Sequence, residues 1–145
     1  MKFEQAFTDA LLEVVLTSAG IPLQVLSSES GMSFAEITGV MNLNGSKQGI
    51  LFISADVASI ETLFCHMTGA QKGEVTQGDI YDTLCELVNM TAGNAKLRLG
   101  DDQFILSSPF ALRGENMTII PKKKVRVLAW MIGNDEITFQ LKVVF

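Results

Sequence analysis

The chain has 145 residues and a mass of 15.8 kDa, and 48% of its residues are hydrophobic. This is enough apolar material for the core of one domain, which we expect to span residues 1–145. Eleven basic and sixteen acidic residues give a formal net charge of −5. The chain therefore lacks the excess of cations that binding to nucleic acid or to an anionic membrane requires. With one histidine, His66, and two cysteines, Cys65 and Cys85, it cannot form a zinc site of several Cys and His ligands or a Cys-x-x-Cys redox pair.

No segment has the roughly 18 apolar residues of a membrane span, and residues Met1–Gln5 do not begin an apolar signal sequence. Two cysteines without a disulfide framework fit a reducing compartment. We therefore expect a cytoplasmic protein that does not insert into a membrane, with both thiols filling space in the core.

The apolar residues of Lys2–Ala19 recur at intervals of three and four, which predicts a first helix that Gly20 and Pro22 end. Leu23 and Val25 then indicate a short strand. The change from the helical period to an alternating one marks the start of a sheet.

A longer strand is predicted over Phe34–Leu43 and a returning strand over Gln48–Ile53. Asn44-Gly45 is predicted to form the hairpin turn between them, because both residues tolerate a positive φ angle.

A second helix is predicted over Val57–Met67, with Ser54 or Asp56 as its N-cap and Gly69 at its end. The polar segment Ala70–Gly78 is predicted to be a surface loop.

The longest helical pattern, Asp79–Leu99, is followed by a strand around Phe104–Ser107 and a turn at Ser108-Pro109. The strands Val125–Ile132 and Glu136–Phe145 form a C-terminal hairpin. The last strand alternates apolar with polar residues, so only one of its faces is predicted to be buried. Its predicted outward residues are Thr138, Gln140 and Lys142. The sum is an α+β fold in which helices cover one face of antiparallel hairpins.

The helix Asp79–Leu99 carries a polar stripe opposite its apolar face. Asp82, Glu86, Asn89, Gly93 and Lys96 follow one another at intervals of three or four, so they lie on one side. Spacing alone favours ordinary solvent exposure for such polar residues. Glycine costs about 1 kcal/mol relative to alanine in a helix interior. Gly93 therefore indicates either close packing against a neighbouring element or the close approach of a partner.

The stretch Glu86–Lys96 resembles the signature helix of the CheC/CheX/FliY phosphatases of bacterial chemotaxis. The family pattern is Asp or Ser, three residues, Glu, two residues and Asn, and Asp82, Glu86 and Asn89 match it. Glu36–Gly45 is similar to the family's first hairpin.

The resemblance extends to Ser108–Gly114, which is similar to a later strand and turn of the family. The first helix has Glu13, but Leu16 stands three residues later, so a second copy of the motif is absent. This departure points to the single-site CheX branch.

The resemblance implies a CheC-like fold of the α+β class, a largely antiparallel β-sheet with long helices packed on one face. It also implies hydrolysis of the aspartyl phosphate on a CheY-type response regulator. Asn89 would orient the attacking water, since a carboxamide offers a donor and an acceptor without a negative charge. Glu86 would pair with the regulator's active-site lysine. Asp82 and Gly93 would face the regulator, which would supply Mg²⁺, so no cofactor or metal ligand of this chain is expected.

Two rival function classes are open at this point. A non-catalytic dimeric interaction or scaffold module of chemotaxis or flagellar signalling has a similar composition, although it does not need Asn89. A small-molecule sensor needs a cavity enclosed by its helices. The resemblance further implies a homodimer, and the long strands Val125–Ile132 and Ile137–Phe145 are candidates for an uncovered edge that pairs with a second chain.

Three other features have simpler interpretations. His66 is interpreted as a partly buried or surface residue of the second helix. Cys85 is interpreted as a core residue, because no basic neighbour in the sequence favours a thiolate. Lys122–Lys124 is interpreted as a solvated turn, with electrostatic steering toward a regulator as the alternative.

Overall fold

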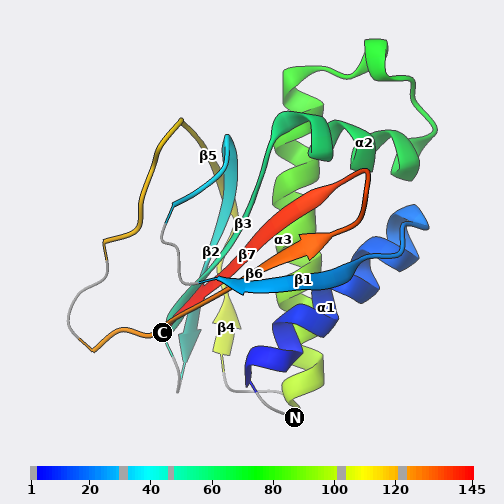
Figure 1. The fold of residues 1–145 in the computed structure, drawn as a ribbon. Coiled ribbons are helices and arrows are strands. Elements are labelled where there is room, and N and C mark those ends of the chain that lie inside the picture. Colours follow the sequence, from blue (N-terminus) through cyan, green and yellow to red (C-terminus); the bar gives the residue numbers. More distant parts are fainter. Residues whose placement is uncertain (1–2, 30–32, 46–47, 101–103, 121–123) are drawn as a thin grey trace.

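The computed structural model describes residues 3–29, 33–45, 48–100, 104–120 and 124–145. Its helices lie together on one face of a sheet (Figure 1). They are α1 (Phe3–Ala19), α2 (Val57–Thr68), the short 3₁₀ helix η1 (Lys72–Glu74) and α3 (Gln77–Leu99). None of the described helices has both the length and the apolar character needed to cross a membrane.

The described strands form one seven-stranded antiparallel sheet. They are β1 (Gln24–Glu29), β2 (Ile37–Gly45), β3 (Gly49–Ala55), β4 (Phe104–Leu106), β5 (Phe110–Arg113), β6 (Val127–Gly133) and β7 (Thr138–Val144). The order across the sheet is β1-β6-β7-β3-β2-β4, and β5 also pairs with β2. The predicted α+β fold class is confirmed.

The helix boundaries follow from their caps. The Asp56 carboxylate accepts a hydrogen bond of 2.9 Å from Ser59 N at the start of α2, so Asp56 is the N-cap and Ser54 belongs to β3. Helix α3 begins two residues earlier than predicted, at Gln77. Thr76 and Asp79 cap it reciprocally, with hydrogen bonds of 3.1 Å and 3.0 Å between the side chain of each and the backbone N–H of the other.

The first hairpin is confirmed, but its turn is not where the sequence placed it. Asn44 and Gly45 belong to β2 and pair with Ile105 and Phe104 of β4, so the prediction that Asn44-Gly45 is the turn is wrong. The strand runs past the expected turn because β4 supplies it with a second partner. It also begins at Ile37 rather than at Phe34. Residues 46–47 lie outside the described part of the chain.

The C-terminal hairpin lies inside the sheet. Strand β6 has β1 and β7 as neighbours, and β7 has β6 and β3. The prediction that these strands offer an uncovered edge is therefore wrong, because β1 and β3 occupy both sides of the hairpin. The sheet ends with β1 on one side and with the short strands β4 and β5 on the other.

Helix α3 rests directly on β2. A Cβ atom added to Gly39 would lie 2.5 Å from Val88 Cγ2 and 3.1 Å from Leu84 Cγ, so no larger residue fits beneath the helix without displacement. The core cluster between the two layers includes Phe7, Leu11, Leu84 and Leu141. This packing fixes which side of α3 faces solvent.

The second face of the sheet is also covered at one position. Lys142, predicted to point outward, is 0% exposed. Its Nζ donates a hydrogen bond of 3.1 Å to Gln140 Oε1 and lies 5.5 Å from the ring centroid of Phe34. Phe34 in turn contacts the ring of Phe52. The segment before β2 thus buries a lysine that the alternating pattern assigned to solvent.

Candidate functional site

The polar stripe predicted from the sequence lies on the outer side of α3. Asp82, Glu86 and Asn89 are exposed, and Gly93 is half-buried. Within the described part of the chain, the side chains of Glu86 and Asn89 make no hydrogen bond or ion pair. A carboxylate and a carboxamide are therefore presented side by side on a helix, free to meet another molecule.

The N-terminal part of α3 is tied to β5 beside this stripe. The Tyr81 hydroxyl accepts hydrogen bonds from Gln77 Nε2 at 2.9 Å and from Arg113 Nη1 at 3.2 Å. Arg113 Nη2 also lies 3.5 Å from Glu36 Oε2. Glu36 Oε1 accepts a hydrogen bond of 3.0 Å from Val57 N at the start of α2. This network joins α2, α3 and the sheet, which the sequence pattern did not predict.

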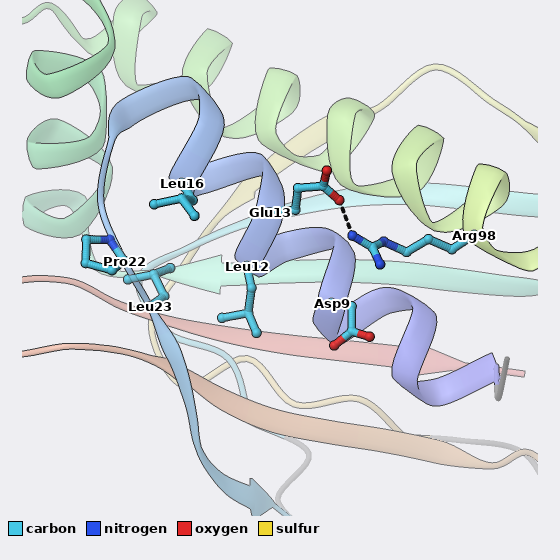
Figure 2. Close-up of a pocket in the computed structure, with 7 residues that line it drawn as sticks. All are labelled: Asp9, Leu12, Glu13, Leu16, Pro22, Leu23 and Arg98. Atoms are coloured by element: carbon cyan, nitrogen blue, oxygen red, sulfur yellow. Dashed lines mark hydrogen bonds and ion pairs between the residues drawn. The ribbon is translucent and has the colours of Figure 1, made fainter.

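The C-terminal half of α3 is tied to α1 (Figure 2). Arg98 Nη2 donates to Glu13 Oε2, and Asn94 Nδ2 donates to the same oxygen at 3.3 Å. Arg98 Nε also donates to Asn94 Oδ1 at 2.6 Å. Together with the network at Tyr81, these contacts hold α3 in place toward both of its ends, and the polar stripe lies between them.

The same contacts distinguish α1 from α3 at the positions that correspond to the motif. Asp9, Glu13 and Leu16 have the spacing of Asp82, Glu86 and Asn89, but Glu13 is occupied by Arg98. Leu16 instead lines an open groove of about 420 Å³ on the surface of α1 (Figure 2). The groove is lined by Asp9, Leu12, Glu13, Leu16, Pro22, Leu23 and Arg98. The absence of a second motif in α1 is therefore visible in its contacts as well as in its sequence.

Gly93 has no packing role inside the described chain. A Cβ atom added to it would have nothing within 4 Å apart from its chain neighbours and the backbone of its own helix. The first of the two interpretations, close packing against a neighbouring element, is therefore wrong. The glycine keeps the helix surface low on the side that Glu86 and Asn89 share, which is consistent with a close-approaching partner.

The other reactive side chains of the described residues add no nucleophile or metal ligand to the polar stripe. Burial, and then the negative charge of Asp82, raise the pKa of the Cys85 thiol, which disfavours a nucleophilic thiolate. His66 is exposed on α2, and its Nδ1 donates to Thr62 O at 2.9 Å. Lys124 is exposed, and Lys122 and Lys123 lie outside the described residues. The described chain contains no group of three His, Cys, Asp or Glu side chains that could hold a metal ion.

Solved structures with the same fold were found. A CheC-like superfamily protein from Shewanella sp. PV-4 has 24% sequence identity and a TM-score of 0.84, covering 99% of this chain and 98% of that one. The chemotaxis protein CheX from Vibrio vulnificus has 19% identity and a TM-score of 0.83, covering 99% and 95%. The CheX–CheY–BeF₃–Mg²⁺ complex from Borrelia burgdorferi has 20% identity and a TM-score of 0.73, covering 99% and 97%.

These likenesses confirm the CheC-like fold. A search of curated proteins gives no significant match. A family profile described as "Chemotaxis phosphatase CheX" matches residues 37–132, which include all of β2, β3, α2 and α3 and therefore the whole polar stripe. The chain belongs to the CheX family of chemotaxis phosphatases.

Proposed function

We propose that this protein dephosphorylates a CheY-type response regulator and that the polar stripe of α3 is its active site. The observation that carries the proposal is the exposure of Glu86 and Asn89, side by side and unpaired within the described chain, in a member of a chemotaxis phosphatase family. The related CheX from Borrelia burgdorferi has been solved with CheY, BeF₃ and Mg²⁺, which supports a CheY-type partner.

In the proposed reaction, the water oxygen attacks phosphorus in line as the bond to the aspartyl oxygen breaks. Inorganic phosphate and a free aspartate carboxylate are the products. The Asn89 carbonyl oxygen accepts a hydrogen bond from the attacking water, and its NH₂ group donates to a phosphoryl oxygen. A carboxylate in this place would repel the phosphoryl group, whereas the amide carries no charge.

Glu86 has a different role in the proposal. Its Cβ lies on the same side of the helix as that of Asn89, about 5–6 Å away for residues three apart. We propose that its carboxylate pairs with the regulator's active-site lysine and so sets the position of Asn89 over the phosphoryl group. Mg²⁺ belongs to the regulator in this account, so this chain supplies one amide and one carboxylate. Asp82 and Gly93 face the regulator.

The proposal includes a homodimer and the cytoplasmic location predicted from the sequence. The alternative is a non-catalytic interaction or scaffold module with the same fold. A phosphatase shortens the lifetime of the phosphorylated regulator when present in less than equimolar amount, whereas a scaffold binds without turnover.

The test is a decay measurement on a CheY-type regulator from the same genome, phosphorylated with a small-molecule donor that is then removed. We expect the purified protein, at one tenth of the regulator concentration, to accelerate phosphate release over several turnovers. An unchanged decay rate with demonstrable binding would favour the scaffold alternative. An unchanged rate without binding would remove the CheY-type partner as well.

A further inference from the structure

The exposed stripe of α3 does not end at Gly93. Lys96 and Leu97 follow it three and four residues later, so both continue the stripe of Asp82, Glu86, Asn89 and Gly93. Leu97 is 82% exposed. At 1.5 Å of rise per residue it lies about 12 Å from Asn89 along the helix axis. One face of one helix thus carries a polar pair and, beyond one glycine, an exposed leucine beside the half-buried Lys96.

Nothing within the described chain accounts for the exposure of Leu97. Single exposed leucines are common on protein surfaces and need no explanation by themselves. Leu97, however, shares its helix face with Gly93, a glycine inside a helix with open space where its Cβ would be. Alanine there would favour the helix without a steric clash. This surface suits a partner whose backbone lies close to the helix at Gly93 and which covers the side chain of Leu97.

We propose that Gly93 and Leu97 form an apolar anchor for the phosphorylated regulator, separate from the chemistry at Glu86 and Asn89. This inference rests on the proposed function and commits to the same occupant. The regulator places its phosphoaspartate at Asn89, and its backbone crosses Gly93. An apolar patch about 12 Å from its phosphoryl group covers Leu97. Leu97 lies on the same helix face as Glu86 and Asn89, and this continuity is what assigns the occupant.

The Gly93→Ala variant separates docking from folding because the two effects have opposite signs. Alanine should raise the melting temperature by about 2–4 °C, since helix propensity improves and the space is open. The added methyl group should nevertheless weaken binding to the regulator loaded with BeF₃⁻ and Mg²⁺ by about tenfold. Titration calorimetry and thermal unfolding measure the two quantities on the same preparation.

Leu97→Ala is the second variant, and Leu16→Ala is its matched control. Leu16 is a leucine on the surface of α1, outside the stripe of α3, and is 52% exposed. We expect Leu97→Ala to raise the dissociation constant and the half-saturating regulator concentration about tenfold, with the maximal rate unchanged. Leu16→Ala should change neither quantity.

The outcomes distinguish this inference from the proposed function. If the wild-type protein binds and dephosphorylates the regulator, but Gly93→Ala and Leu97→Ala bind as tightly as wild type, the anchor is refuted and the proposed function stands. If the wild-type protein does not bind the BeF₃⁻-loaded regulator, both fail together. If Gly93→Ala lowers the melting temperature, the premise that this glycine has no packing role is wrong.

Discussion

At the scale of single residues, Glu86 and Asn89, the two central side chains of the stripe, differ in charge. Asn89 is neutral and can approach a phosphoryl group, whereas Glu86 is an acid suited to a cationic partner. Helical spacing predicted that both side chains share one exposed face, whereas the roles proposed for them come from the family resemblance. It did not predict that Glu13, one of the residues of the incomplete copy in α1, is paired with Arg98, since that contact joins distant parts of the chain.

Replacing Glu86 by alanine should weaken association more than chemistry. We expect the half-saturating concentration of phosphorylated regulator to rise about tenfold or more, because a charge-assisted pair across the interface is lost. Initial rates measured over a range of regulator concentrations give both kinetic constants. A reduced maximal rate with unchanged saturation would contradict the role assigned to Glu86.

Lys142 offers a residue-scale test of the sheet's second face. Burial lowers the pKa of its ammonium group, so the folded state binds fewer protons than the unfolded state between this lowered pKa and the ordinary lysine value of about 10.4. The free energy of unfolding should therefore rise with pH through this interval. Lys142→Met should remove that rise and increase stability at neutral pH. Urea unfolding across the pH range measures the free energy of unfolding of both proteins. If its pH dependence is the same in Lys142→Met as in the wild type, Lys142 is not the titrating group.

At the scale of elements, the packing of α3 on β2 sets the orientation of this helix. Local signals predicted the helix and most of its length. The capping box at Thr76 and Asp79 was missed because a Gly-containing polar segment precedes the apolar period, and this placed the start two residues too late. The course of β2 past Gly45 was missed for a different reason. It depends on pairing with β4, which follows α3 in the chain.

The close approach of β2 and α3 at Gly39 gives an element-scale prediction. Gly39→Ala should lower the free energy of unfolding by about 1–3 kcal/mol, because the new methyl group meets Val88 and Leu84. Denaturant unfolding measures the loss. Adding Val88→Ala should recover part of it, since the space that Val88 vacates admits the methyl group. Additive losses in the double variant would mean that the strain arises elsewhere.

At the scale of the whole molecule, the order of strands was beyond what local patterns can predict. Strand β1 pairs with β6, for example Gln24 with Gly133, and this contact encloses the C-terminal hairpin. The sequence patterns predicted the antiparallel class and every strand except β5, which only the family resemblance over Ser108–Gly114 implied. It did not predict which strands lie at the edges, because sequence periodicity reports which faces are buried and not which neighbours are adjacent.

The proposed homodimer is expected to use the β1 edge. Strand β1 has six residues with exposed Val25 and Leu26, whereas β4 and β5 at the other end have three and four. Both edges carry exposed apolar residues, so strand length decides between them: short edge strands resist pairing with other chains, and longer ones invite it. Val25→Lys should therefore convert a dimer into monomers in analytical ultracentrifugation, and Ile105→Lys on β4 should not. The opposite pattern would assign the interface to the other edge.

We propose that an uncharged amide on a fixed helix is the main catalytic contribution of this protein. The Asn89→Ala variant isolates this contribution, because the residue is exposed and removal of its amide leaves the core intact. We measure the maximal rate of phosphate release from the phosphorylated regulator, together with binding to the BeF₃⁻-loaded form. We expect the rate to fall by about 100-fold or more while binding stays near the wild-type value. A variant that keeps near wild-type turnover would contradict it.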